Sequence, residues 1–375
     1  MSKIAILTDS SCDIPQEMAE KYGIDIMSFH ILLDDVDYVE RESCTNTEFY
    51  DKMRAAKGVP STAAITPIQF CEKYCQYVDE GYTDVIHVPI NKSGSSTYNN
   101  ALMAQGMLRE ERPEHHLKIH LLDPHTYSMV FGWYLCEMAR KLKNGAEISH
   151  VIREFEKQMD CMEIVLGPYS LKQMKKSGRI SAAAAVMGEL MGIRPIITLI
   201  DGKTKVEAKV RGDDKVVPAM VELCKQRSEG VENFDYMIGH TNIPQTADLE
   251  KACRKAFGKP PLLVFELGGV VSANTGPDTV ALVYTGHPRG EHVFQSWLRF
   301  RSGHFSGNFI FILRFRKACG LFGTSFSPEG SKPKTASVPD SAKIRCNLPK
   351  IMLYCLLLCF LCGILSEQLR ILGSP

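Results

Sequence analysis

Ile-Ala-Ile-Leu-Thr-Asp-Ser-Ser-Cys-Asp-Ile-Pro, residues 4–15, is the stretch from which the architecture of this chain can be predicted. Its first four residues form an uninterrupted apolar run, which is typical of a strand buried on both faces of a parallel sheet. A polar loop follows, and Asp13-Ile14-Pro15 then predicts the start of a helix that ends at Gly23. Because a strand, a polar loop and a helix follow in this order, the stretch indicates an α/β fold.

The same strand–loop–helix order recurs further along the chain. Two capping boxes, each a threonine three residues before Glu or Gln, predict helices that begin at Thr45 and Thr66. Apolar runs at residues 85–88 and 119–122 predict two more buried strands, and each is followed by a helical pattern, the first capped by Ser95 or Ser96. Repeated β–α segments imply a parallel sheet with helices on both faces, and we assign residues 1–160 to this N-terminal domain.

A second domain is expected over residues 161–289, where the pattern changes. Residues 196–200 and 204–210 flank Asp201-Gly202 and predict a β-hairpin, so this domain contains antiparallel pairing. Further strands and helices alternate up to about residue 284. The predicted fold is therefore α/β with two domains, a parallel-sheet N-terminal domain and a mixed-sheet second domain.

Residues 290–375 differ from the rest of the chain. They hold 11 basic and 4 acidic residues, whereas residues 1–289 hold 33 basic and 39 acidic residues. Helix and strand periodicity fades, and residues 325–340 are rich in Ser, Pro and Lys, as in disordered segments. The apolar run at 351–365 is shorter than the roughly 20 residues that span a bilayer. We expect a non-homologous, poorly ordered tail and no stable membrane anchor.

Composition excludes several classes of protein. The 375 residues are 45% hydrophobic and 23% charged with a net charge of +1, so neither a disordered chain nor an electrostatic nucleic-acid binder is indicated. The cysteines of residues 1–289 are scattered, as unpaired thiols in a reducing compartment would be, and we expect a cytoplasmic protein. Cys71 and Cys75 would share a helix face, but with no His or Cys nearby they do not predict a zinc site.

Hydroxyl side chains follow the predicted strands at one edge of the sheet. They lie in Thr8-Asp9-Ser10-Ser11, in Ser61-Thr62, in Ser93-Gly94-Ser95-Ser96-Thr97 and in residues 123–127. Each alone is explained as a helix cap. Together, at the carboxyl ends of parallel strands and beside helix N-termini, they favour a site for an anionic oxygen group.

Motifs for common anionic ligands are absent from the sequence. There is no G-x-x-x-x-G-K-[ST] loop, no G-x-G-x-x-G after a strand and no G-x-S-x-G elbow. A small-molecule phosphotransferase that uses Asp9, Asp13 or Asp123 to hold a metal stays open as an alternative, although it lacks a nucleotide cradle. A lipid-sensing regulatory protein is a second alternative.

Several motifs, in this order, resemble those of the DegV family. They are Thr8-Asp9-Ser10-Ser11, Ser61-Thr62 before Thr66-Pro67, Ser93-Gly94-Ser95-Ser96-Thr97-Tyr98, Lys175-Lys176-Ser177-Gly178-Arg179-Ile180-Ser181, Arg194-Pro195-Ile196 and Asn274-Thr275-Gly276-Pro277. The resemblance covers residues 1–289. It implies a protein without chemistry of its own or a cofactor, which buries one long-chain fatty acid with the carboxylate at the domain junction. It also implies a partner, a DAK-type fatty acid kinase subunit that forms the acyl phosphate for phospholipid metabolism.

The resemblance also implies roles for individual residues. The carboxylate ligands would be Thr62, Ser95, Ser10 and Asn274. Apolar candidates for the acyl tunnel are Leu166, Met187, Met191 and Ile193, and a basic stretch that could meet the kinase holds Lys175, Lys176 and Arg179.

Two departures from the family pattern bear on the polar end of the site. Asn274 stands where the family usually has His, and Asn does not titrate near neutrality. Ala63-Ala64-Ile65 replaces the family's Ser-Gln-Pro, which removes polar neighbours but leaves Thr62 and Ser95 in place.

Overall fold

The computed structural model of the chain describes residues 3–178 and 192–289. A four-stranded parallel sheet has the order β2-β1-β6-β7. Its strands are β1 (Ile4–Asp9), β2 (Ile24–Met27), β6 (Asp84–Val88) and β7 (Lys118–Leu121). The parallel N-terminal sheet predicted from the first apolar runs is confirmed.

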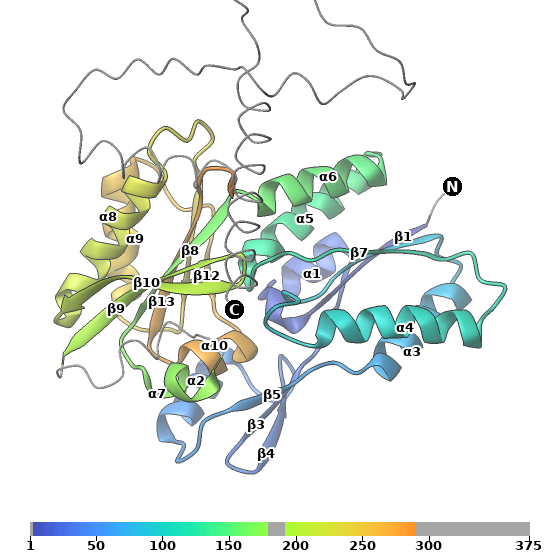
Figure 1. Ribbon diagram of the computed structural model, residues 1–375, viewed down its shortest axis with the longest axis horizontal. Helices are drawn as coiled ribbons and strands as arrows, with labels where there is room; N and C mark the ends of the chain where they lie inside the picture. Colours follow the sequence, from blue (N-terminus) through green and yellow to red (C-terminus); the bar gives the residue numbers. More distant parts are fainter. Residues whose placement is uncertain (1–2, 179–191, 290–375) are drawn as a thin grey trace, which may run out of the picture. The chain divides into compact units, whose positions relative to one another are not determined.

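Helices cover both faces of this sheet, as Figure 1 shows. They are α1 (Gln16–Tyr22), α3 (Pro67–Asp79), α4 (Thr97–Glu111), α5 (Met129–Lys143) and α6 (Ile148–Met159). Successive strand residues point to opposite faces, so Ile6 packs with α1, α5 and α6 while Leu7 packs with α3 and α4. This two-sided burial explains why the strands read as continuous apolar runs.

Both predicted capping boxes are formed. The Thr45 hydroxyl accepts from the Glu48 N–H at the start of α2 (Asn46–Ala55), and the Thr66 hydroxyl accepts from the Gln69 N–H at the start of α3. In each box the Glu or Gln side chain accepts from the backbone N–H of its threonine. The helix starts are therefore determined by local sequence.

A small antiparallel sheet, which the sequence analysis did not predict, has the order β4-β3-β5. Its strands are β3 (His30–Leu33), β4 (Val36–Val39) and β5 (Ser61–Ala63). Asp34 and Asp35, both with positive φ, make the tight turn between β3 and β4. Thr62, expected in a loop, lies on β5 and pairs with Ile31. Three small exposed residues carry no alternating pattern, so β5 had no strand signal.

The remaining strands form a six-stranded mixed sheet with the order β10-β9-β8-β13-β11-β12. They are β8 (Met162–Pro168), β9 (Ile193–Ile200), β10 (Lys203–Arg211), β11 (Tyr236–His240), β12 (Val264–Glu266) and β13 (Thr279–Thr285). Only β11 and β12 run parallel; the other neighbours are antiparallel. The predicted hairpin around Asp201-Gly202 is confirmed as β9–β10.

One face of the mixed sheet packs on α8 (Val216–Arg227) and α9 (Gln245–Phe257). The other face, with Ile164 and Leu199, joins the same apolar cluster as α5 and α6. The two sheets therefore share a core between them. Two short helices, α7 (Lys172–Ser177) and α10 (Gly269–Thr275), complete the α-helices among the described residues. Within the described ranges, no helix is long and apolar enough to cross a membrane.

Candidate functional site

A cavity of about 200 Å³ lies where residues of both sheets meet. Its apolar walls are Phe29, Ala64, Ile90, Val130, Ile164, Leu166, Leu199, Phe265, Leu267, Val270, Val271, Ala281 and Val283. Its polar lining is Thr62, Gly94, Ser95, Ser96, Tyr127, Ser128, Asn274 and Thr275. Native interiors rarely keep voids much larger than a water, so a cavity of this size indicates a ligand. Neither Lys nor Arg occurs among the described lining residues.

The structure brings three of the four predicted carboxylate ligands to this cavity. Thr62 comes from β5, Ser95 from the loop after β6, and Asn274 from α10. These elements are far apart in the sequence, but β5 is a strand of the small antiparallel sheet and α10 lies against both α2 and β5. Their role as ligands stays a prediction.

Ser95 is held so that it can still donate a hydrogen bond. Its hydroxyl accepts from the Thr97 N–H at 3.2 Å and lies 2.8 Å from the Thr97 hydroxyl, where either oxygen is the donor. A serine hydroxyl has one proton and two lone pairs. When the Thr97 hydroxyl donates, Ser95 accepts both bonds and keeps its own proton for a further hydrogen bond.

The loop that carries Ser95 is closely packed. The Asn91 side chain accepts from the N–H and the hydroxyl of Ser93 at 2.9 and 3.0 Å. Gly94 lies so close to the Tyr127 hydroxyl that a Cβ at position 94 would overlap it. A larger residue at position 94 would displace the Tyr127 ring, so the glycine lets Tyr127 reach the cavity beside Ser95.

Asn274 uses part of its hydrogen-bonding capacity within α10. Its Nδ2 donates to the Val270 carbonyl at 2.8 Å. The amide has a second N–H and a carbonyl oxygen, which leaves one donor and one acceptor for the cavity.

Ser10, the fourth predicted ligand, is absent from the cavity lining. It is buried in the short 3-10 helix η1 (Ser10–Cys12), where its hydroxyl accepts from the Phe29 N–H at 3.0 Å. A hydrogen bond from Ser10 also reaches the Glu40 carboxyl. Its observed place is thus beneath the site, among buried acids.

Three buried carboxyls hold the loops under the cavity. Asp9 accepts from the Ile90 N–H at 2.6 Å and from Ser11, and Asp13 accepts from the hydroxyl of Ser128. Burial raises the pKa of Asp9 to about 7, although its hydrogen bonds lower it. Burial raises the pKa of Asp13 well above its usual range, and the nearby Glu40 raises it further.

Glu40 belongs to the same group of buried acids. Burial raises its pKa, and hydrogen bonds from Ser10 and from the Val270 N–H counteract that effect. The Val270 N–H lies 2.8 Å from Glu40 Oε1, so the acid connects β4 to the start of α10. The cluster therefore positions Ile90, Ser128 and Val270, three residues of the cavity wall.

Four polar lining side chains were not predicted as ligands: Ser96, Tyr127, Ser128 and Thr275. Ser128 has a positive φ, and its N–H donates to the Ser11 carbonyl at 2.9 Å. That backbone geometry cannot be inferred from a lone serine in a sequence, although Tyr127 does follow the last strand of the parallel sheet.

The other predicted residues divide into three groups. Leu166 lines the cavity, whereas Ile193, at the start of β9, is not among the lining residues. Lys175 and Lys176 are exposed in the last turn of α7. Met187, Met191 and Arg179 lie outside the described residues.

A parallel sheet and a mixed sheet meet at one cavity with apolar walls and uncharged hydrogen-bonding groups. This arrangement defines a two-domain α/β protein with a candidate ligand site. The sequence model of the DegV family, described as "Uncharacterised protein, DegV family", matches residues 3–286. The chain belongs to the DegV family, and the predicted two-domain fold is confirmed.

Relatives and solved structures resemble nearly the same part of the chain. A DegV domain-containing protein of Clostridium perfringens is 28% identical over 293 residues, which cover 76% of this chain and 99% of the relative. A fatty acid binding DegV family protein from Streptococcus agalactiae is 26% identical with a TM-score of 0.67, covering 76% of this chain and all of the other. A stearic acid-binding protein from Eubacterium ventriosum is 21% identical with a TM-score of 0.70, covering 77% and 100%. The descriptions of both of these structures name fatty acid binding.

Proposed function

We propose that this protein binds one long-chain fatty acid, with the carboxylate held by Thr62, Ser95 and Asn274 and the acyl chain in the apolar cavity. The observation that carries the proposal is the composition of the cavity lining, which combines many apolar side chains with several uncharged hydrogen-bond donors and, among the described residues, no Lys or Arg. An amphiphile with a small anionic head matches that distribution. Relatives whose descriptions name fatty acid binding support the same ligand class.

The energetics agree with a site that lacks a cationic side chain. Burial of each CH₂ contributes about 0.8 kcal/mol, so a sixteen-carbon chain offers on the order of 11 kcal/mol of gross stabilisation. The hydroxyls then need only orient the carboxylate, and each hydrogen bond to a charged group contributes up to about 3 kcal/mol. Leu166 in the cavity wall supports the proposed tunnel.

We further infer that the protein is a carrier in the cytoplasm and has no catalytic activity of its own. In this role it presents the carboxylate to a separate kinase subunit, which forms the acyl phosphate. Lys175 and Lys176 are exposed and adjacent, as a contact with an acidic partner surface requires.

The structure weighs against a phosphotransferase built on the same loops. Asp9 and Asp13 are buried, and burial raises the pKa of both carboxyls. Asp9 and Asp13 already accept hydrogen bonds from the Ile90 N–H and the Ser128 hydroxyl, so a Mg²⁺ ion for phosphoryl transfer would have to displace contacts that hold these loops.

Native mass spectrometry of the purified full chain tests the ligand class. We expect a co-purified mass of a C14–C18 acid; a bound nucleotide instead would favour the phosphotransferase.

ATP turnover tests the carrier role. The chain alone should hydrolyse no ATP, and acyl phosphate should form only when a DAK-type kinase subunit is added. Robust ATP hydrolysis by the chain alone would reverse this assignment.

A further inference from the structure

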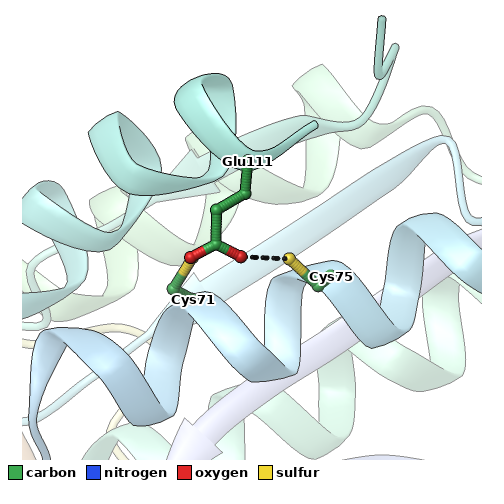
Figure 2. A group of neighbouring side chains, drawn as sticks. All are labelled: Cys71, Cys75 and Glu111. Atoms are coloured by element: carbon green, nitrogen blue, oxygen red, sulfur yellow. Dashed lines mark hydrogen bonds between the residues drawn. The ribbon is translucent and has the colours of Figure 1, made fainter. Parts of the chain in front are cut away.

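Two cysteines and a glutamate converge on the outer face of the parallel sheet. Cys71 and Cys75 lie four residues apart on α3 and therefore share one face of that helix. Glu111, the last residue of α4, turns its carboxylate toward both sulfurs, as Figure 2 shows. One ligand atom from each residue lies within 4.8 Å of the other two.

The packing of α3 against α4 brings a third potential metal ligand, Glu111, next to the two thiols, which have no such neighbour in the sequence. The thiols are 1% and 8% exposed, and the Glu111 side chain is exposed to solvent. The Cys75 thiol donates to Glu111 Oε2 at 3.6 Å. The expectation of no metal considered only neighbours in sequence, and Glu111 is 36 residues from Cys75.

The donor set selects a class of metal. Two sulfurs and one carboxylate oxygen suit Zn²⁺, which binds sulfur at about 2.3 Å and oxygen at about 2.0–2.2 Å in tetrahedral geometry. In such a site two sulfurs lie about 3.8 Å apart. The observed separations need to shorten by no more than about 1 Å, which side-chain rotation can provide.

We propose that Cys71, Cys75 and Glu111 form a zinc site that joins α3 to α4, with water from the exposed side as the fourth ligand. The two thiols lose their protons when Zn²⁺ binds, so two protons pass to solvent and two Zn–S bonds form. No oxidant or reductant takes part.

The thiolate rather than the thiol is the metal ligand, so both cysteines must lose a proton when the metal binds. Burial raises the pKa of the Cys71 thiol to about 12, and the Glu111 carboxylate contributes to the same effect. Zinc must therefore displace both protons, and its apparent affinity increases with pH.

The site is separate from the lipid cavity. None of its three residues is among the lining residues of the cavity. The metal would instead stabilise the pair of helices that covers one face of the parallel sheet. Bound zinc adds to the free energy of unfolding in proportion to the logarithm of its concentration over its dissociation constant.

Cobalt(II) titration of the reduced full chain tests the site, because thiolate coordination produces a sulfur-to-cobalt charge-transfer band. The chain has five further cysteines after residue 290, so the informative quantity is the difference between variants. Cys71→Ser with Cys75→Ser should remove one tightly bound cobalt per chain. Glu111→Gln, a change at an exposed position, should weaken binding at least ~tenfold.

Two matched controls accompany these variants. Glu110→Gln removes the same charge one residue earlier on α4, and Cys136→Ser removes a buried thiol from α5. Both control variants should bind cobalt as the unmodified chain does. Zinc should displace cobalt from the two control variants and from the unmodified chain. If Glu111→Gln and Glu110→Gln bind equally, or the double cysteine variant keeps the full band, the cluster is a thiol–carboxylate hydrogen bond and the proposal is wrong.

Discussion

At the scale of single residues, the polar end of the cavity relies on neutral groups. Asn274 replaces the histidine usual in the family, and its Nδ2 is bonded to the Val270 carbonyl. An amide keeps the same charge at every physiological pH. Thr62 and Ser95 were predicted from motif matches, and the structure brings them with Asn274 to one cavity. Ser10 was predicted with them, but its neighbours are buried acids, a contact that depends on tertiary packing.

The carboxylate assignment leads to a first prediction. Thr62→Val combined with Ser95→Ala removes two donors while preserving shape. Each hydrogen bond contributes about 1 kcal/mol or more, so fatty-acid affinity should fall at least ~tenfold in a titration with a fluorescent fatty acid. Ser93→Ala, which alters a hydroxyl of the same loop that does not line the cavity, should leave affinity unchanged. If the folded double variant keeps its affinity for the fatty acid, Thr62 and Ser95 are not the carboxylate ligands.

The buried acids lead to a second prediction, on pH. The pKa values of Asp13 and Glu40 are raised in the folded state, so the protonated forms favour folding. Their stabilisation is complete below the ordinary carboxyl pKa near 4 and is lost as pH rises through the folded-state values. Glu40→Gln removes one of these groups and its repulsion of Asp13. Between about pH 5 and about pH 8, the free energy of unfolding should therefore fall less in the variant than in the unmodified protein.

Chemical denaturation at several pH values measures this slope. Glu42→Gln changes an exposed carboxyl two residues away and should follow the unmodified protein. Parallel curves for Glu40→Gln and the unmodified chain would show that the acid cluster does not control the pH dependence.

At the scale of elements, the sequence predicted best those helices and strands whose signals lie within a few neighbouring residues. Helices α2 and α3 begin directly after the threonines of their predicted capping boxes. The strand β5 and the helices α6 and α10 were missed. β5 exists because β3 offers it a partner, and α10 packs its Val270 and Ala273 into a core built from distant residues. Tertiary contacts, rather than propensity, form β5 and α10. Helix α6 does carry a local signal, because Val151, Phe155 and Met159 lie on one buried face, and that signal was overlooked.

The cap of α3 gives a third prediction because this helix starts directly after the strand of Thr62. Thr66→Ala removes the hydroxyl that accepts from the Gln69 N–H, at a cost of about 1 kcal/mol. The Tm should fall by about 2–4 °C in differential scanning calorimetry. Asn100 Nδ2 donates to the Ile65 carbonyl at 2.7 Å, so the loosened helix start should also disturb the cavity and weaken fatty-acid binding.

Thr45→Ala is the matched control for this change, since it removes the same kind of cap from α2. It should lower the Tm by a similar amount and affect fatty-acid affinity less. If Thr66→Ala and Thr45→Ala lose the same amount of fatty-acid affinity, the cap of α3 has no particular influence on the cavity.

At the scale of the whole described structure, one apolar cluster includes residues of both sheets. Ile6 and Ile86 of the parallel sheet belong to the same cluster as Ile164 and Leu199 of the mixed sheet. The cavity opens within this shared core, so a bound acyl chain would complete the packing between the sheets. Ligand binding and folding stability are then linked, and a bound fatty acid raises the free energy of unfolding. The domain boundary at residue 160 stays a prediction, because residues on both sides of it belong to this one apolar cluster.

The last prediction concerns residues 290–375, which lie outside the described residues. The family match ends at residue 286, and the net charge changes from −6 over residues 1–289 to +7 over the rest. A chain that ends at Gly290 should therefore be a soluble monomer with full fatty-acid affinity. The rival hypothesis is a membrane anchor at residues 351–365, yet fifteen helical residues reach only about 22 Å of a ~30 Å hydrocarbon core. Leu357→Glu in the full chain separates the two: an anchor would lose membrane association, whereas a loosely packed extension would fractionate as before. If the truncated chain unfolds, or if only the full chain without this change sediments with membranes, the extension is a functional part of the protein.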